Sequence, residues 1–423
     1  MERIIKGAFR ILLILLPVSV WGQGPVPGDI YREYTRTLGH TNFDWRVTGP
    51  NVKREDARIF LPNPVLDIRI DDLKGAVKAE VLLDRWGGHA GTMDKKIRFN
   101  GNDWISLPEL TTTPPGQRPE SYHYQDNPII PVPLEQLKEG LNTFEGTCDT
   151  TQKGWPQWGW DAVIMRIYYD ASKPHPTGKI TSPVAGETFG ENPVITADAK
   201  AKAGIERIDF LAYYDGYDEN GDGIYQDWHH HYWCIRGDKN IDIRGHVGTA
   251  FEYPYAVKWD TSLLPDQEKG TVKLMARIKD KNGIWYVTNV VEGLSLERNG
   301  YSIKMFTASD IPISFNVRNY QAKTCKIRVA PETELENAVE AWFYIRTWNG
   351  YARNHEPFTI NEWPTVFQGH NHNFDMDLIP IPVIIVRPGD NLVSFYSKTI
   401  HHGAEVLWPG PAFIVRFQHQ KGH

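Results

Sequence analysis

The stretch AVKAEVLLDRWGG (Ala76–Gly88) decides the fold, because a variant of it, AVEAWFYIRTWNG (Ala338–Gly350), returns later in the chain. In both copies apolar and polar residues alternate before a tryptophan and a glycine, as in a half-buried β-strand. Three further blocks match in the same order: FNGNDW (Phe99–Trp104) with FTINEW (Phe358–Trp363), PVPLEQLKEGLNTF (Pro131–Phe144) with PIPVIIVRPGDNLV (Pro380–Val393), and GWDAVIMRI (Gly159–Ile167) with GPAFIVRF (Gly410–Phe417). We therefore predict two related β-sandwich domains, at residues 26–172 and 298–420.

The composition also favours β-structure. Glycine (36) and proline (29) are frequent, and tryptophan (15), tyrosine (19) and phenylalanine (17) are abundant. Only two short segments, residues 132–140 and 332–342, have a pattern that a helix would accept. The predicted fold class is all-β, with several sandwiches.

The first residues, MERIIKGAFRILLILLPVSVWGQG, have the pattern of a secretory signal peptide, with basic residues before an apolar run at 11–21. A membrane-spanning helix needs about 20 apolar residues, so this run is too short to span a bilayer. We expect residues 1–22 to be removed and the mature protein to be secreted, either extracellular or periplasmic, with no membrane span. A net charge of −6 is mild, and no basic block indicates a nucleic-acid partner.

The order of the matched blocks resembles the galactose-binding-like jelly-roll modules of secreted carbohydrate-active proteins. The resemblance rests on FNGNDW, then VPLEQLKEGLNTFEG (Val132–Gly146), then a closing strand. Asn100-Gly101 supplies the positive φ that a tight hairpin needs. The second copy has Thr359-Ile360 in place of Asn-Gly, so we expect a different turn there. The resemblance implies a polysaccharide or glycan as the partner.

Residues 175–297, between the two copies, resemble a bacterial Ig-like module. The residues that carry this resemblance are Ser182-Pro183, Gly186, Phe189, Ile208, Phe210, Trp259-Asp260-Thr261, Ala276 and residues 280–283. The resemblance implies a spacer or platform without chemistry of its own. The full fold prediction is therefore two related jelly-roll β-sandwiches flanking an Ig-like β-sandwich.

Inside the middle module, YDENGDGIYQDWHHHYW (Tyr217–Trp233) contains the opening of a calcium loop. In such a loop the side chains at positions 1, 3 and 5 point to one centre, a glycine at position 6 permits the bend, and the carbonyl of position 7 adds an oxygen. The predicted ligands are Asp218, Asn220, Asp222, the carbonyl of Ile224, and Asp227 in place of the missing glutamate at position 12. We expect a structural Ca²⁺, and the alternative is an acidic, solvated turn.

Three histidines follow the acidic loop. If they begin a strand, His229 and His231 lie on one face, where two imidazoles could bind zinc or transfer protons near neutral pH. The candidate catalytic residues are therefore His229, His231, Tyr232 and Arg236. The alternative is a partly buried aromatic face beside the loop.

Loop-borne aromatic residues are candidates for stacking on sugar rings. Trp155 and Trp158 lie in a loop rich in glycine and proline, and we expect both to be exposed. Tyr122 and Tyr124 complete the candidate carbohydrate-binding set. The competing explanation is core packing, which we expect for the strand-borne tryptophans Trp86, Trp104, Trp342 and Trp348.

These observations support three functions, and the sequence leaves open whether the protein is an enzyme. The favoured one is a secreted carbohydrate-binding or adhesion protein with a structural calcium loop. The alternative is a polysaccharide-degrading lyase or glycosidase with its site near the calcium–histidine region, and the third is a structural surface-layer component. An enzyme requires convergent polar groups with perturbed pKa values in a pocket, whereas a binding module requires a shallow aromatic shelf.

Overall fold

The computed structural model describes residues 24–38, 45–151, 154–229, 232–235, 241–244, 247–349, 357–366, 373–400 and 403–419. The predicted all-β class is confirmed: within these residues the only α-helix is α1 (Glu55–Arg58), and η1 (Pro119–Ser121), η2 (Leu134–Gln136), η3 (Leu335–Asn337) and η4 (Val383–Ile385) are single 3₁₀ turns. No helix in the described part is long and apolar enough to cross a membrane. The predicted signal peptide lies outside the described residues.

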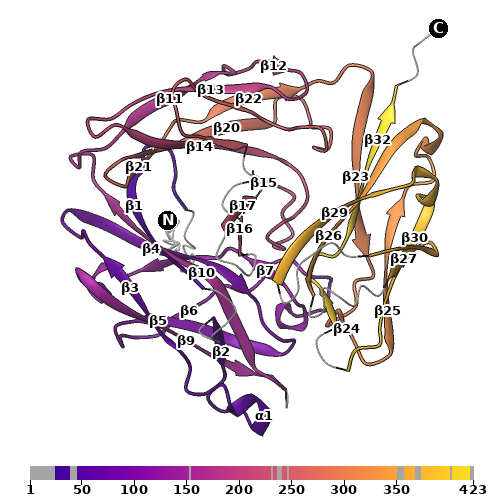
Figure 1. Cartoon of the computed structure of the whole chain (residues 1–423), viewed down its shortest axis with the longest axis horizontal. Coiled ribbons are helices and arrows are strands. Elements are labelled where there is room, and N and C mark those ends of the chain that lie inside the picture. Colours follow the sequence, from indigo (N-terminus) through magenta and orange to yellow (C-terminus); the bar gives the residue numbers. More distant parts are fainter. Residues whose placement is uncertain are drawn as a thin grey trace, which may run out of the picture.

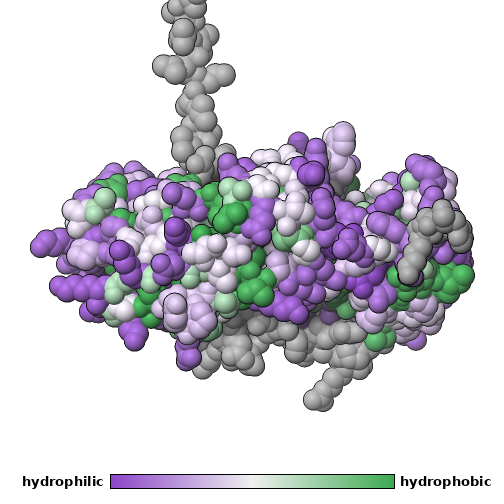
Figure 2. All heavy atoms as spheres, turned by 90° about the horizontal axis from the view of Figure 1, so that it is seen from above, coloured by the Kyte–Doolittle hydropathy of each residue, from purple (hydrophilic) through white to green (hydrophobic). Residues whose placement is uncertain are grey.

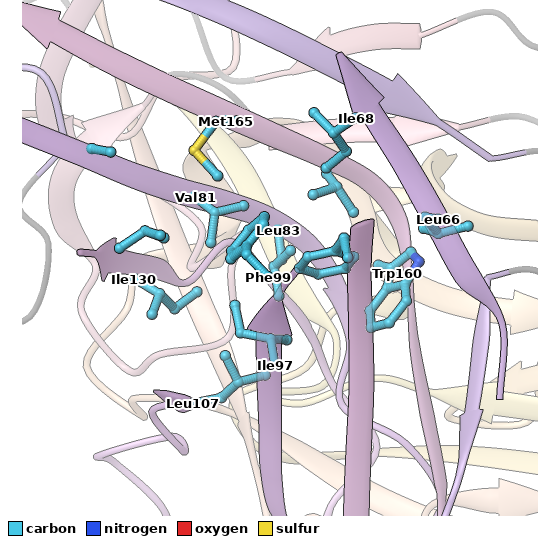
Figure 3. Packing of buried hydrophobic residues seen from close by; sticks show 14 of the residues in the cluster. Leu66, Ile68, Val81, Leu83, Ile97, Phe99, Leu107, Ile130, Trp160 and Met165 are labelled. Atoms are coloured by element: carbon cyan, nitrogen blue, oxygen red, sulfur yellow. The ribbon is translucent and has the colours of Figure 1, made fainter. Parts of the chain in front are cut away.

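The first sandwich has two layers. Its strands are β1 (Ile30–Thr37), β2 (Arg46–Thr48), β3 (Val65–Ile70), β4 (Ala76–Trp86), β5 (Thr92–Phe99), β6 (Ile105–Ser106), β7 (Gln125–Asp126), β8 (Ile129–Val132), β9 (Gly140–Thr150) and β10 (Gln157–Tyr169). One layer is β3-β9-β5-β6, and the other has β1, β10 and β4 at its centre. The core lies between them: Val81 and Met165 from one layer meet Ile97 and Phe99 from the other (Figure 3).

The middle unit joins the first sandwich through a shared sheet. Its strands are β11 (Thr177–Ser182), β12 (Thr188–Phe189), β13 (Val194–Lys200), β14 (Ile205–Asp215), β15 (Gln226–His229), β16 (Tyr232–Ile235), β17 (Ile241–Arg244), β18 (Gly248–Ala250), β19 (Tyr255–Lys258), β20 (Val272–Asp280), β21 (Ile284–Val287) and β22 (Val291–Leu296). β21 pairs with β1, so one sheet runs β12-β22-β20-β21-β1-β10-β4-β7 across both units. Strands β11, β13 and β19 form the opposing layer.

The second sandwich repeats the pairings of the first. Its strands are β23 (Tyr301–Ser309), β24 (Asn316–Val317), β25 (Gln321–Val329), β26 (Ala338–Asn349), β27 (Phe358–Ile360), β28 (Trp363–Thr365), β29 (Asn373–Ile381), β30 (Gly389–Ser397), β31 (Ala404–Val406) and β32 (Ala412–Gln418). β26 pairs with β32 and β29 as β4 pairs with β10 and β8. The order β25-β30-β27-β28 repeats β3-β9-β5-β6. The four matched sequence blocks therefore occupy equivalent strands and corners.

The expectation of a different turn in the second copy is wrong. Asn361 and Glu362 both have positive φ (46° and 70°), as Asn100 and Gly101 do (51° and 69°), so the same turn is present two residues after the position that the block alignment gave. In both copies the turn asparagine donates to the side chain of a buried asparagine at the start of the next long strand, over 2.8 Å to Asn142 and 2.6 Å to Asn391.

The three units close into a ring (Figure 1). The β16–β17 hairpin of the middle unit lies in the centre of that ring, with β16 against β10, β4 and β29. The sheets β3-β9-β5-β6 and β25-β30-β27-β28 lie on the outer flanks of the ring. The segments that connect β14 to β16 therefore start from the middle unit and reach the place where all three units meet.

Candidate metal centre and interdomain junction

The acidic loop lies between β14 and β15 and is anchored on the second sandwich. The Gly216 amide donates to the Tyr225 carbonyl and closes the loop (2.9 Å). The Tyr217 hydroxyl donates to the Gly410 carbonyl (2.5 Å), and the Tyr217 ring packs on Tyr344 with centroids 4.1 Å apart. The Tyr344 hydroxyl donates in turn to Glu219 Oε1 (3.0 Å). The loop is therefore an interface element, not a solvated hairpin tip.

Two glycines let the tip of the loop fit between the two sandwiches. A Cβ on Gly221 would lie 2.7 Å from the Trp408 carbonyl oxygen of the second sandwich, and a Cβ on Gly223 would overlap Thr112 of the first. Both glycines have positive φ (66° and 83°), which glycine adopts without steric cost. Thr112 Oγ1 donates to the Asp222 carbonyl at the same place. The loop thus contacts both sandwiches at once.

Within the loop, the side chains at positions 1, 3 and 5 fold back on its backbone. Asp218 accepts hydrogen bonds from the amides of Asp222 (3.1 Å) and Gly223 (2.8 Å), and Asp222 accepts one from Ile224 (2.8 Å). Asn220 Oδ1 accepts from the Asp222 amide (3.3 Å), while its Nδ2 donates to Asp222 Oδ2 (3.2 Å). These bonds gather the oxygens of three side chains around one short turn.

Burial and the charge of Asp222 raise the pKa of two neighbouring aspartates. Burial, followed by the charge of Asp222, raises the pKa of Asp218 to about 7. Burial also raises the pKa of Asp227 to about 6, and Asp222 adds to the rise. Hard oxygen donors of this kind fit Ca²⁺. Among the described residues, no group of three or more His, Cys, Asp or Glu side chains is arranged to hold a metal, so a cation here would also need Asn220 and backbone carbonyls.

Of the candidate catalytic residues, the structure describes the side chain of His229 alone. His229 is buried and stacks on the Tyr214 ring with centroids 3.7 Å apart. Burial lowers its pKa to about 4, so the imidazole is neutral at pH 7. Tyr232 begins β16, but its side chain lies outside the described residues, as do His231 and Arg236. The buried aromatic environment that the sequence left as an alternative therefore holds for His229.

The expected aromatic platform is wrong in three of its four residues. Trp158 is 0% exposed because it lies on β10, where its Nε1 donates to the Thr147 carbonyl (3.1 Å). Tyr124 is buried with its hydroxyl on Glu109 (2.6 Å), and buried Tyr122 packs on Trp408 with centroids 4.5 Å apart. Trp155 is half-buried. The Gly/Pro-rich composition indicated a loop, but β10 begins at Gln157 and takes Trp158 into the core.

A buried polar cluster, which the sequence did not reveal, joins the two sandwiches. Gln125 Nε2 donates to Asp84 Oδ1 (3.0 Å) and Asp161 Oδ2 (3.2 Å) within the first sandwich. Arg346 of the second sandwich donates to Gln125 Oε1 (2.7 Å) and to the Gln125 carbonyl (3.1 Å). Burial, followed by the charge of Asp161, raises the pKa of Asp84 well above its usual value. Gln125 thus links a carboxyl pair to the opposite unit.

A second ionic contact crosses the same interface. His123 Nδ1 lies 3.2 Å from Glu405 Oε2, and Asn316 Nδ2 donates to Glu405 Oε1 (3.1 Å). Burial alone would raise the pKa of Glu405, but His123 lowers it overall to about 2. Neighbouring His89 is half-buried, and burial lowers its pKa to about 4. These residues lie far apart in sequence, so no local pattern could have grouped them.

Of the exposed aromatic side chains among the described residues, Phe251 (64%) and Tyr253 (79%) lie in the middle unit between β18 and β19, and the other three lie on the outer flanks of the ring of units. Trp104, which we expected in the core, is 39% exposed in the corner between β5 and β6. Tyr396 on β30 is 40% exposed, and Tyr320, in the turn before β25, is 65% exposed. The exposure of Tyr396 could have been predicted from the sequence, because β30 alternates buried and exposed residues and Tyr396 falls on the exposed side.

No family model and no curated protein matches the chain. Among solved structures, the fibronectin(III)-like modules of CbhA from Clostridium thermocellum align with 53% of this chain and 97% of theirs, at 13% identity and a TM-score of 0.18. A β-porphyranase of glycoside hydrolase family 86 from the human gut bacterium Bacteroides plebeius aligns over 62% of this chain and 38% of its own, at 10% identity and a TM-score of 0.23. The protein SGBP-B of a Bacteroides ovatus mixed-linkage glucan utilization locus, in complex with a mixed-linkage heptasaccharide, aligns over 84% and 70%, at 9% identity and a TM-score of 0.16. This chain thus spans well under half of the β-porphyranase structure, and similarities this weak carry no argument about its activity.

Proposed function

We propose that this protein is a secreted carbohydrate-binding protein whose β-units are held together by a calcium loop. The observation that carries the proposal is the exposure of Tyr320 and Tyr396 on the outer flank of the second sandwich, while Trp158, Tyr122 and Tyr124 are buried. An exposed ring held by a strand or a tight turn offers a flat apolar face at a small entropic cost. Such faces suit the C–H surfaces of sugar rings.

The burial of the titratable groups at the junction favours binding over catalysis. An enzyme of the lyase or glycosidase type needs its acid and base within reach of a polysaccharide. Asp84, Asp161 and His229 are buried, so a polymer has no access to them in this arrangement of the units; His89 is half-buried. One observation still favours an enzyme: the raised pKa of Asp84 beside Asp161 is of the kind found in catalytic acid pairs.

The calcium part of the proposal assigns the loop a structural role. Asp218, Asn220, Asp222 and Asp227 would supply side-chain oxygens, and Ile224 would supply its carbonyl oxygen. A bound Ca²⁺ would offset the repulsion between the aspartates and stiffen a loop that contacts Thr112 on one side and Trp408 on the other. In this proposal the metal stabilises the assembly of the three units and takes no part in sugar recognition.

Gel electrophoresis and product chromatography test the function together. The mature protein is run through gels containing mixed-linkage β-glucan, xylan, agarose or polygalacturonate, with Ca²⁺ or with EDTA, and each polymer is also chromatographed after incubation. Retardation in at least one gel with intact polymer supports the proposal. New oligosaccharides would overturn it in favour of the enzyme, and the absence of both retardation and products would overturn it altogether.

Thermal unfolding tests the calcium loop separately. Millimolar Ca²⁺ should raise the melting temperature of the wild-type protein above its value in EDTA, because a ligand that binds only the folded state stabilises it by mass action. Asp222→Asn keeps the size of the side chain but should abolish most of the rise. Asp215→Asn, an exposed position just before the loop, is the control and should keep it. Equal Ca²⁺ responses in all three proteins would exclude the loop as the site.

A further inference from the structure

The outward sheet of the first sandwich has an ion pair at its centre. Arg98, Glu145 and Val65 lie side by side on β5, β9 and β3, and they face outward because Phe99, Phe144 and Leu66 next to them fill the core. Arg98 Nη2 donates to Glu145 Oε2 (2.8 Å), and the Arg98 guanidinium lies 4.3 Å from the centre of the Trp104 ring. Long charged side chains therefore cover the middle of this face.

The equivalent row in the second sandwich is small and uncharged. Strand pairing places Thr359, Ser394 and Thr324 side by side on β27, β30 and β25, with Ile360, Val393 and Cys325 in the core behind them. Three hydroxyl side chains thus replace Arg98, Glu145 and Val65. They leave a shallow surface that offers hydrogen-bond donors and acceptors to a ligand.

Tyrosines border this row of hydroxyls. Tyr396 lies two residues beyond Ser394 on the same face of β30, and its partner across the strand pair is Ala322, which is too small to cover the ring. Tyr320 lies just before β25, where its amide donates to the Ser397 carbonyl (2.8 Å). A flat face with hydroxyls in the middle and exposed rings at one end is the form of a shelf for an extended sugar chain.

The backbone at Tyr320 is strained. Asn319 and Tyr320 both adopt left-handed conformations, with φ of 60° and 59°. This conformation costs a bulky residue about 1 kcal/mol, and a glycine would avoid that cost. The Tyr320 ring is 65% exposed, so core packing does not account for its retention there. Strain of this kind is found where a side chain has a role outside the fold.

The charges on this face indicate a neutral ligand. Lys326 lies 3.2 Å from Asp390 and 3.6 Å from Asp310, so its charge is already paired. Beside it, on β30, Leu392 is exposed. The face lies on the outer flank of the ring (Figure 1), and a hydrophobic area appears at the corresponding end of the molecule (Figure 2). The row of hydroxyls itself carries no cation; Arg328, two residues beyond Lys326 on the same face of β25, lies opposite Asp390 in the strand pairing.

We infer that the second sandwich carries the glycan-binding surface, on the outward face of β25, β30 and β27, and that it takes a neutral polysaccharide chain. Tyr396 and Tyr320 stack on the sugar rings, and the hydroxyls of Ser394, Thr324 and Thr359 bond to the sugar. The matching face of the first sandwich is closed by the Arg98–Glu145 pair. The inference rests on the proposed function and specifies its site and ligand class.

Transferring charged side chains from the face of the first sandwich to that of the second tests this inference. The double variant Thr359→Arg/Ser394→Glu transfers the ion pair of the first sandwich to the second and should abolish retardation by the neutral polymers, mixed-linkage β-glucan, xylan and agarose. Tyr396→Ala should weaken binding of whichever of these polymers the wild type binds at least tenfold. Trp104→Ala is the matched control in the first sandwich and should bind like the wild type. Circular dichroism and the melting temperature establish that each variant is folded.

The outcomes separate this inference from the proposed function. If the graft and Tyr396→Ala bind normally while Trp104→Ala loses affinity, the inference is wrong and the protein still binds carbohydrate, through its first sandwich. Retention by polygalacturonate alone would overturn the neutral ligand class. A wild-type protein that binds none of the polymers would instead contradict the proposed function itself.

Discussion

Arg166 and Arg416 lie on equivalent strands of the repeat, both on the face turned away from the core of their sandwich, but in opposite surroundings. Each follows the apolar run of the last matched block, on β10 and β32 respectively, and each pairs across the sheet with a glutamate. Arg166 and its partner Glu80 are both 0% exposed, whereas Arg416 is 22% exposed and its partner Glu340 is 46% exposed. Equivalent strands thus each carry an arginine on the face turned away from the core, and the neighbouring unit determines whether that arginine is buried.

The burial of Arg166 follows from the shared sheet. Because β21 continues the sheet of the first sandwich, Glu33 on β1 lies between Arg166 (2.9 Å) and Arg277 of the middle unit (3.6 Å). Burial alone would raise the pKa of Glu33, but Arg277 and Arg166 lower it overall. The second sandwich is attached by point contacts instead: Ile303 on β23 exchanges hydrogen bonds with Asp266 (2.9 and 3.1 Å), and Arg416 donates to Glu191 (2.9 Å).

The largest difference between the two sandwiches is expected when each arginine is replaced in a separate variant. Arg166→Met removes the cation that the buried carboxylates of Glu33 and Glu80 share, leaving them Arg277 and Lys78 respectively, and should cost about 3 kcal/mol of unfolding free energy. Arg416→Met removes two solvent-accessible pairs, with Glu340 and Glu191, and should cost about 1 kcal/mol or less. Urea unfolding, followed by tryptophan fluorescence, measures both. Equal losses of unfolding free energy in the two variants would mean that the buried arginine contributes no more to stability than the exposed one.

The interface between the sandwiches gives a pH-dependent test. Because the pKa of Glu405 is lowered to about 2, the ionised form stabilises the fold, and its contribution is complete above the ordinary pKa of about 4.5 and is lost as the pH falls toward 2. A shift of about 2.5 units corresponds to about 3 kcal/mol. Glu405→Gln should therefore be about 3 kcal/mol less stable at pH 7, with the difference vanishing near pH 2.

Urea titrations of wild-type and variant proteins at several pH values give that difference directly. Taking the difference cancels the opposite effect of Asp84, whose raised pKa destabilises the fold at neutral pH in both proteins. A difference that stays constant from pH 7 to pH 2 would contradict the ionic contact with His123.

The sequence predicted the features that local patterns and the repeat determine, and it missed the contacts that form only when the units pack against one another. The all-β class follows from alternation and composition, and the matched blocks identify equivalent strands. Trp104 was expected on a strand in the core but lies in an exposed corner, and Trp158 was expected in an exposed loop but lies buried on β10; in both cases the end of the strand was misplaced. The Asp84–Gln125–Arg346 cluster joins residues from two units, and no spacing along the chain indicates such a contact.

Replacing the buried asparagines at the starts of β9 and β30 tests whether the two corners depend on them to the same extent. Asn142 and Asn391 are each 0% exposed, and each bonds to the backbone of the preceding turn as well as to the turn asparagine. Replacing either with alanine leaves buried amides and carbonyls without partners, so each variant should lose about 2–3 kcal/mol. Thermal unfolding of Asn142→Ala and Asn391→Ala measures the two losses. A large loss in one copy alone would show that only that corner depends on its asparagine.

The smallest effect is expected from exchanging the residue that follows the turn asparagine. Glu362 occupies the left-handed position (φ 70°) that Gly101 occupies in the first copy (φ 69°), and this conformation costs a side chain about 1 kcal/mol. Glu362→Gly should therefore stabilise the protein by about that amount, less a few tenths for the exposed contact with Arg387. Gly101→Glu, the reverse change, should destabilise the protein by a similar amount, because nothing lies within 4 Å of the new Cβ to oppose it or support it. Opposite shifts in melting temperature would establish that the two turns are the same structure two residues out of step with the block alignment; shifts of the same sign would exclude it.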